Sequence, residues 1–405
     1  MNAPDPRQVT MSRFERMWAA LGTIGRDPGT GGFRRYAWTA EDATLREWFA
    51  GEATVRGLDL TTDRAGNQWA WWGNPDDQPG VVLGSHLDSV PDGGAFDGPL
   101  GVVSAFAALD AMRTEGFSPG RPVGVVHFGD EEGARFGVAC AGSRILTGVL
   151  DADRARALRD AAGVSMADAM ARSGTDPAHV GRDDETLRRV GTFVELHIEQ
   201  GCALADLGRP VAVGSAIWPH GRWRFDLLGE ANHAGTTSLV DRRDPMLAFA
   251  SVVLAARAAA VRHGALATCG KVTVEPNGVN AIPSQITGWL DSRGSDAERV
   301  RAVVAEITAV VDGHGGAVSE ESWTGETGFE PALTARLATL LDNAPVLPTG
   351  AGHDAGILAA AGVPTAMLFV RNPTGVSHSP AEHAEHADCL AGVAALAAVT
   401  RDLAR

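Results

Sequence analysis

The stretch GVVLGSHLDSVPDGGAFDG (residues 80–98) joins an apolar run to a glycine-rich segment that holds one histidine and three aspartates. Short apolar runs of this kind are typical of buried strands in parallel sheets. The polar residues then follow the carboxyl end of the strand, where open α/β sheets bind their ligands. The stretch therefore predicts an α/β fold with a functional site at this strand end.

The same pattern recurs along the chain. A helical pattern over 100–116 follows the first run, and three further apolar runs end near polar residues: GVVHFGDEEG (124–133), GTFVELHIEQG (191–201) and PTAMLFV (364–370). Apolar runs that alternate with amphipathic helices predict a mostly parallel sheet with helices on its faces. We expect the ends of these strands to lie side by side.

A second architecture interrupts the first. From about residue 213 the pattern predicts a strand, a helix, two strands, a helix and a strand, at 222–230, 244–264, 271–280, 284–294, 296–315 and 316–324. This β-α-β-β-α-β order forms a compact sandwich that can be inserted into another domain. We predict a domain at 213–325 inserted into a discontinuous domain formed by 1–212 and 326–405.

Length and charge restrict the possible partners. A chain of 405 residues usually forms more than one domain. Its formal net charge of −15 repels nucleic acid and anionic membranes, so we expect neither as a partner.

We expect a cytoplasmic protein. The first residues, MNAPDPRQVTMSRFERMW, contain no apolar export segment, and Arg257 interrupts the apolar stretch LAFASVVLAARAAAV. The four cysteines are scattered without C-x-x-C spacing, which indicates neither a disulfide framework nor a zinc knuckle.

Metal-binding side chains accompany the apolar runs. His86 and Asp88 form an H-x-D pair on one face of the first strand end. Asp97 follows among glycines that let the chain fold back, His197 lies within the third run, and His378 follows the fourth. Taken alone, each has an ordinary explanation as a surface hydrogen bond, a turn or a core histidine. Their joint placement at strand ends predicts a metal site.

Three acidic residues, Asp130, Glu131 and Glu132, follow the second run. Adjacent carboxylates repel one another, and beside a buried strand end they must be neutralised by cations or protons. A metal ion provides that neutralisation, which strengthens the prediction of a metal site.

Taken in order, the motifs GSHLDSV, GGAFDG, DEEG, HIEQG, NHAGTT, GAGHDA and SHSPAE resemble those of the M20-type amidohydrolases. The resemblance is to the branch of N-carbamoyl-L-amino acid hydrolases, β-ureidopropionases and allantoate amidohydrolases, and it covers nearly the whole chain. It implies a di-metal catalytic domain with an inserted lid and dimerisation domain, and hence a homodimer.

The resemblance also implies roles for single residues. His86 and His197 would hold one metal ion, Glu132 and His378 a second, Asp97 would bridge them, Asp88 would orient His86, and Glu131 would be the general base. The ions would activate a shared water, and Glu131 would move its proton to the leaving nitrogen. Imidazole and carboxylate ligands leave Zn, Mn, Co and Ni open.

Further residues would bind the substrate. By resemblance, His233 would stabilise the developing oxyanion. Gln200, Asn280 and Arg293 match positions that hold the ureido group and the carboxylate, and the planar fork of arginine suits a carboxylate. The loop that contains Gly350, Gly352 and His353 would contribute backbone N–H groups.

The implied reaction is hydrolysis of a linear ureido amide, allantoate or an N-carbamoyl amino acid, with release of ammonia and carbon dioxide. Two alternatives stay open: an aminopeptidase or dipeptidase on the same scaffold, and a ligand-binding relative without chemistry. A loose dinucleotide-binding pattern, G-x-G-x-x-A over 350–355, is weak because proline interrupts the segment before it and no clear strand precedes it.

Overall fold

The computed structural model describes residues 6–405. The chain separates into two compact units: unit 1, formed by the residues up to 215 together with 328–405, and unit 2, residues 216–327. The expected boundaries, 213 and 325, lie slightly earlier. The difference at the first boundary arises because strand β6 (Val211–Ile217) continues the sheet of unit 1 beyond residue 212.

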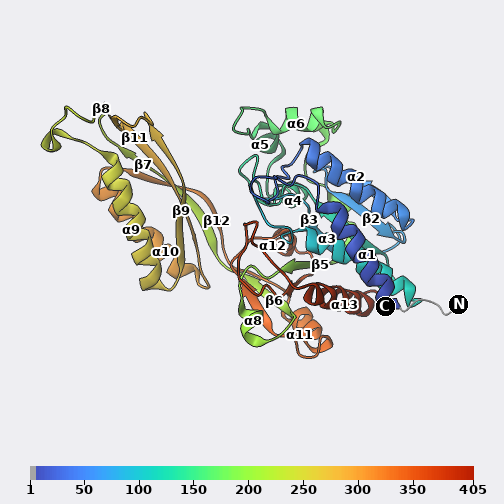
Figure 1. The fold of residues 1–405 in the computed structure, drawn as a ribbon. Coiled ribbons are helices and arrows are strands. Elements are labelled where there is room, and N and C mark those ends of the chain that lie inside the picture. The colour runs from blue at the N-terminus through green and yellow to red at the C-terminus, as the bar shows by residue number, and fades with distance from the viewer. Residues whose placement is uncertain (1–5) are drawn as a thin grey trace. The chain divides into compact units, whose positions relative to one another are not determined.

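A nine-stranded sheet forms the centre of unit 1 (Figure 1). Its main path runs β1 (Asp59–Thr62), β2 (Gln68–Trp72), β4 (Val123–Phe128), β3 (Gly80–His86), β5 (Val190–Ile198), β15 (Thr365–Val370), β6 and β13 (Thr327–Gly328), and β14 (Val346–Thr349) pairs with β6. Strands β4, β3, β5 and β15 are mutually parallel, and β2 and β6 flank them in antiparallel orientation. The carboxyl ends of the four central strands therefore meet at one edge, and the predicted fold class is confirmed.

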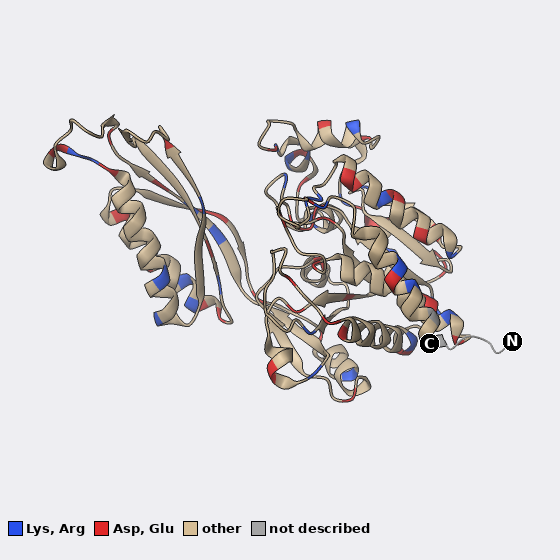
Figure 2. Ribbon diagram, viewed as in Figure 1, with Lys and Arg blue, Asp and Glu red and all other residues tan. Residues whose placement is uncertain are grey.

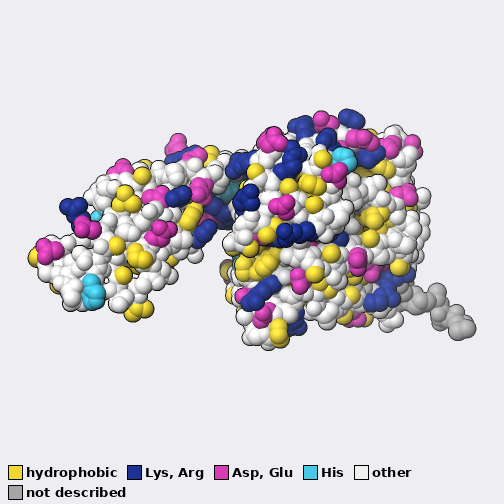
Figure 3. Space-filling model, turned by 90° about the horizontal axis from the view of Figure 1, so that it is seen from above, with side chains coloured by type: hydrophobic (Ala, Val, Ile, Leu, Met, Phe, Trp, Pro, Cys, Tyr) yellow, Lys and Arg dark blue, Asp and Glu magenta, His cyan; other side chains and the backbone are white. Residues whose placement is uncertain are grey.

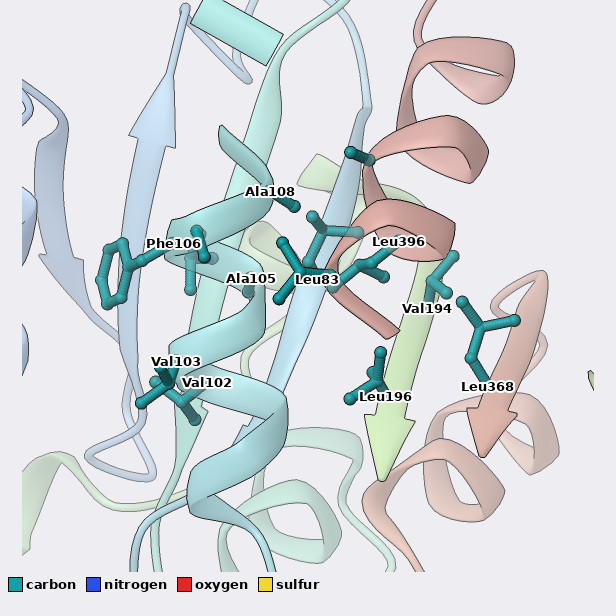
Figure 4. Packing of buried hydrophobic residues seen from close by; sticks show 14 of the residues in the cluster. Leu83, Val102, Val103, Ala105, Phe106, Ala108, Val194, Leu196, Leu368 and Leu396 are labelled. Atoms are coloured by element: carbon teal, nitrogen blue, oxygen red, sulfur yellow. The ribbon is translucent and has the colours of Figure 1, made fainter. Parts of the chain in front are cut away.

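Helices α3 (Pro99–Thr114) and α13 (His386–Leu403) cover one face of this sheet. Figure 4 shows Leu83, Val194 and Leu368 of the strands beside Ala105 of α3 and Leu396 of α13. These side chains are fully buried, and each buried leucine stabilises the fold by about 1.5–3 kcal/mol. The core thus fixes the strand ends that carry polar residues.

The opposite face of β5 carries Phe193, Glu195 and His197, since successive side chains of a strand alternate between faces. Helix α12 (Asp354–Ala360) lies against this face, where the N–H of Ala355 donates to Glu195. The other α-helices of unit 1 are α1 (Pro6–Leu21), α2 (Ala40–Val55), α4 (Ala141–Thr147), α5 (Ala152–Ala157), α6 (Met166–Arg172), α7 (Asp184–Arg189), α8 (Ala203–Leu207) and α11 (Pro331–Leu340), and a short 3-10 helix spans Pro177–His179. Figure 2 shows acidic and basic residues interspersed along the ribbons of α1 and α2.

Unit 2 has the predicted β-α-β-β-α-β order. Its elements are β7 (His220–Leu228), α9 (Pro245–His263), β9 (Leu266–Glu275), β11 (Gln285–Arg293), α10 (Ala297–Gly313) and β12 (Ala317–Thr324). The strands form an antiparallel sheet in the order β12-β7-β11-β9, with both helices packed on it. Two short strands, β8 (Asn232–His233) and β10 (Ala281–Ile282), form a separate ladder.

Helix α9 has two different faces. Ala248, Val252 and Ala256 are buried in the core of unit 2, whereas Leu247 and Leu254 are 71% and 73% exposed. By length and composition alone, α9 could cross a membrane; among the described residues it is the one helix that meets this test. Such a result is weak evidence, and the buried face shows that α9 is part of a packed α/β layer.

On the face shown in Figure 3, apolar side chains lie among acidic and basic ones on both units.

Candidate metal centre and active site

Two buried histidines lie at the ends of adjacent parallel strands. His86 is the last residue of β3, and His197 lies near the end of β5. The Nδ1 of His86 contacts the carbonyl oxygen of Asp88 at 3.1 Å, and the Nδ1 of His197 contacts the carbonyl oxygen of Ile198 at 2.9 Å. Because a carbonyl only accepts, each Nδ1 carries a proton, so the neutral form of each ring has its lone pair on Nε2. Both Nε2 atoms are buried and have no hydrogen-bond partner among the described residues.

Asp97 lies between the two histidines and a third one. Its Oδ1 is 3.4 Å from the Nε2 of His86 and 3.2 Å from the Nε2 of His197. Its Oδ2 is 3.4 Å from the Nε2 of His378. One carboxylate therefore presents one oxygen to each of two ligand groups, as a bridging ligand does in two-metal sites.

Glu132 and His378 complete the second group. The Nε2 of His378 is 3.6 Å from the Oε1 of Glu132, an oxygen that is buried and has no hydrogen-bond partner in the described part of the chain. His378 has a φ of 54°, a left-handed conformation that is uncommon for residues other than glycine. Strained backbone of this kind concentrates at functional sites. Both sets, His86–Asp97–His197 and Asp97–Glu132–His378, have the spacing of metal ligands.

Glycine at position 98 allows this packing. Gly98 has a φ of 84°, and a Cβ atom there would overlap the imidazole ring of His86. Any side chain at residue 98 would thus displace the ring of His86.

Glu131 is the buried carboxylate next to the first group. Its Oε2 is 3.8 Å from the Nε2 of His86, and its Oε1 accepts a hydrogen bond from the thiol of Cys140 at 3.3 Å. The carboxylate of Asp88 accepts the N–H groups of Glu131 and Glu132 at 3.1 and 3.0 Å. Asp88 therefore contacts the Nδ1 of His86 through its backbone carbonyl and, at 3.5 Å, through its Oδ1, while its carboxylate also fixes the loop that carries the two glutamates.

The electrostatics of these groups follow from burial and mutual proximity. Burial and neighbouring carboxylates raise the pKa of Glu131 well above its usual range and the pKa of Glu132 to about 7. Burial also disfavours the charged form of Asp97, but the histidines around it, His197 foremost, hold its pKa well below the usual value. The donors are buried carboxylates and imidazole nitrogens that have no hydrogen-bond partner among the described residues, and none of these donors is sulfur. Such donors fit divalent cations such as Zn or Mn.

Two of the expected substrate residues of unit 1 lie beside this centre. The side-chain amide of Gln200 donates to the Oδ2 of Asp97 at 2.9 Å. His353 is buried, its ring centroid is 4.5 Å from that of His197, and burial lowers its pKa well below the usual value, so the ring is neutral. Gly350 and Gly352 lie in the loop before α12.

The segment before this loop differs from the expectation. Strand β14 precedes the loop, although the sequence indicates no clear strand there. It pairs with β6 off the main path of the sheet, a position at which Pro348 is tolerated because an edge strand leaves some N–H groups unpaired.

The remaining expected residues lie in unit 2. His233 pairs with Ala281 on the β8–β10 ladder, and the carbonyl of the neighbouring Asn280 accepts the N–H of Ala234, so the structure brings His233 and Asn280 together. The N–H of Gly235 donates to the Nδ1 of His233 at 3.0 Å. The proton of the neutral ring is therefore on Nε2, where it can be donated.

Arg293 lies at the end of β11, on the other sheet of unit 2. Its guanidinium donates to both carboxylate oxygens of Asp291, at 2.8 and 2.7 Å. The structure thus does not group Arg293 with His233 and Asn280 on one ladder.

Sequence reasoning missed several residues that contact the centre. Glu382, Ser377 and Cys140 each hydrogen-bond to Asp97 or Glu131. Glu382 follows His378 by four residues in SHSPAE, and this spacing is the one signal that could have indicated it.

A buried pair, Asp354 with Ser143, lies further out, and burial next to Glu195 raises the pKa of Asp354 to about 8.

Comparison with known proteins identifies the family. The family model described as Peptidase family M20/M25/M40 matches residues 82–402. An N-carbamoyl-L-amino acid amidohydrolase of Geobacillus stearothermophilus is 38% identical over 405 aligned residues, which cover 95% of this chain and 97% of that protein. Allantoate amidohydrolase of Escherichia coli strain K12 is 35% identical over 400, covering 95% and 96%. A solved amidase of the hydantoinase/carbamoylase family from Burkholderia vietnamiensis has a TM-score of 0.89 at 29% identity, covering 97% of both chains. By these matches, the chain belongs to peptidase family M20/M25/M40.

Proposed function

We propose that this protein is a metal-dependent amidohydrolase that cleaves a linear ureido amide. Its substrate is allantoate or an N-carbamoyl amino acid, and the products include ammonia and carbon dioxide. The observation that carries the proposal is the position of Asp97, which presents one oxygen to each of two ligand groups. The names of the two relatives given above supply the substrate class.

The ligand groups would hold two divalent cations. His86 and His197 would bind one through their orphaned Nε2 atoms, Glu132 and His378 would bind the other, and Asp97 would bind both. Divalent cations in such a site lower the pKa of bound water and polarise the substrate carbonyl. Zn, Mn, Co and Ni all suit these donors.

Glu131 is the proton carrier in this proposal. Its Oε2 faces the first ligand group, and its Oε1 is held by Cys140. It accepts a proton from the water that attacks the ureido carbonyl and delivers a proton to the nitrogen that leaves when the C–N bond breaks. Burial raises the pKa of Glu131 well above its usual range, which favours the protonated form that delivers a proton to the leaving nitrogen.

Substrate contacts are assigned to both units. His233 would donate its Nε2 proton to the oxyanion that forms on the carbonyl oxygen. Gln200, Asn280 and Arg293 would hold the ureido group and the carboxylate of the substrate, and His353 with the N–H groups of Gly350 and Gly352 would line the site. The bidentate contact of Arg293 with Asp291 keeps the guanidinium in one plane for this role.

A panel of substrates tests the proposed reaction. Ammonia release is measured from allantoate, N-carbamoyl-β-alanine and N-carbamoyl-L-amino acids, and amine release from dipeptides, each with added Mn²⁺ or Zn²⁺. We expect turnover of at least one ureido acid and none of the dipeptides. Turnover of dipeptides alone would assign a peptidase. Cation binding without turnover of any of these substrates would indicate a ligand-binding protein that lacks catalytic activity.

We propose further that the protein is a cytoplasmic homodimer. The exposed residues Leu247, Leu254 and Val261, spaced by seven, form an apolar stripe along α9 that suits a second copy of the chain. The four cysteines are free thiols, as suits a reducing compartment. Light scattering should give twice the chain mass for the wild type and the single mass for the Leu254→Glu/Val261→Glu variant, while exposed Val279→Glu stays dimeric.

A further inference from the structure

Glu382 binds the backbone of the loop that carries Asp97. Its Oε2 accepts the N–H of Phe96 at 2.9 Å and the N–H of Asp97 at 3.0 Å. The side chain is only 5% exposed. Two charge-assisted hydrogen bonds to one buried oxygen are strong, so they fix the peptide units on both sides of the Cα of Phe96.

The loop is shaped to admit this carboxylate. A Cβ atom at Gly94 would overlap the carboxylate of Glu382, so residue 94 must be glycine for the backbone to approach so closely. The contact joins residues nearly three hundred positions apart in the sequence. It therefore ties the loop after β3 to the segment after β15.

Ser377 connects the same carboxylate to the side chain of Asp97. Its hydroxyl lies 3.2 Å from the Oδ2 of Asp97 and 3.4 Å from the Oε1 of Glu382. The amide of Gln200 lies 3.3 Å from the same hydroxyl. Ser377 is also the residue directly before His378, which has the left-handed backbone. Glu382 thus acts on both the backbone and, through Ser377, the side chain of Asp97.

We propose that Glu382 is a positioning residue that sets the orientation of the bridging carboxylate of Asp97 and its distance from His378. The proposal rests on the proposed function, because it requires that Asp97 and His378 hold cations. Partners that orient metal ligands typically change cation affinity by 10–100-fold when they are removed. Glu382 itself touches neither the substrate nor the cations in this account.

Cation affinity tests the proposal without any assay of activity. Metal-free protein is titrated with Mn²⁺ by calorimetry for the wild type and for Glu382→Ala, Glu382→Gln, Ser377→Ala and Glu385→Ala. Glu385 is the matched control, since it lies on the same segment but is exposed and contacts only His383 among the ion pairs of the described residues. Circular dichroism and thermal unfolding show whether each variant is folded.

We expect Glu382→Ala to weaken Mn²⁺ binding by roughly 10–100-fold. Glu382→Gln should retain most of the affinity because its amide oxygen can accept the same two N–H groups, and Ser377→Ala should show a smaller loss. Wild-type affinity in Glu382→Ala, or a Gln variant no better than Ala, would overturn the inference. If Glu382→Ala does not fold, unchanged affinity in Ser377→Ala overturns it.

The two proposals fail in different ways. If the wild type binds no Mn²⁺, both the proposed function and the role of Glu382 are wrong. If the wild type binds Mn²⁺ and all variants bind it equally, the proposed function stands and only the role of Glu382 is wrong.

Discussion

The first ligand group of unit 1, His86–Asp97–His197, and the ladder of unit 2 that carries His233 differ in how their side chains are held, whereas His378 of the second ligand group is itself exposed. His86 and His197 are 1% exposed and Asp97 is 7% exposed, whereas His233 and Asn280 are exposed. The first set is fixed by a packed sheet, the second by a few local hydrogen bonds. Chemistry that needs fixed distances is thus assigned to rigid strand ends, and contacts that must admit a substrate are assigned to an exposed segment.

The largest expected effect is the loss of activity in Glu131→Gln, a variant that tests proton transfer separately from cation binding. Glu131→Gln keeps the size of the side chain but removes the group that accepts the proton. We expect kcat to fall by about 10²–10⁴-fold, since this is the usual contribution of a general base. The measurement is the steady-state rate of ammonia release, with bound metal determined on the same sample. Unchanged metal content is the control, and an active Glu131→Gln protein would remove Glu131 from the mechanism.

The next effect tests the exposed region. His233→Ala deletes the proposed oxyanion donor without disturbing a core, so folding and cation binding should be unchanged while kcat falls by roughly 10²–10³-fold. Val279→Ala, at an equally exposed loop position, is the control and should behave as wild type. If His233→Ala loses bound cation, or if its kcat is unchanged, the division of roles between the two regions is wrong.

A pair of glycines compares the two regions directly. Gly98 lies beside the ring of buried His86, and Gly235 lies beside the ring of exposed His233. Gly98→Ala must displace His86, so we expect Mn²⁺ affinity to fall by at least about 10-fold. In Gly235→Ala the new Cβ would lie 3.2 Å from the ring of His233, which is exposed and can shift, so this variant should bind Mn²⁺ as the wild type does. Equal affinities in the two variants would show that packing around His86 does not set the ligand geometry.

The mildest change leaves the sequence intact and varies only the pH at which cations bind. The hydrogen bond with Asp97 raises the pKa of His378 to about 9, and burial raises the pKa of Glu132 to about 7. A cation must displace these protons, so affinity should increase with pH, by about tenfold per pH unit for each proton displaced. The increase should be steepest below pH 7, where both groups hold protons. Calorimetric titration with Mn²⁺ at several pH values measures it, and an affinity that is constant from pH 6 to 9 would contradict it.

Much of the fold could be predicted because its signals are local. The apolar run before His86 and the run that contains His197 indicate buried parallel strands, and the carboxyl ends of such strands meet at one edge. The β-α-β-β-α-β order of unit 2 also follows from local periodicity. Strand β14 was missed because Pro348 masks its pattern, and only its edge position makes that proline acceptable.

The contacts that orient the ligands could not be predicted, since they join distant parts of the chain. The carboxylate of Asp88 was expected to orient His86, but nothing in the sequence shows that it also accepts the N–H groups of Glu131 and Glu132. The contact of Glu382 with the backbone of Asp97 is likewise invisible in a single sequence. Residue types indicated which side chains suit a cation, and the three-dimensional structure was needed to show what holds them in place.

The central claim is that Asp97 bridges two cations. Crystals grown with Mn²⁺ and measured for anomalous scattering test it most directly. The account predicts two peaks about 3.5–4 Å apart, one beside His86 and His197, the other beside Glu132 and His378, with one oxygen of Asp97 on each. A single peak that Asp97 does not contact, or no peak near these residues, would contradict it.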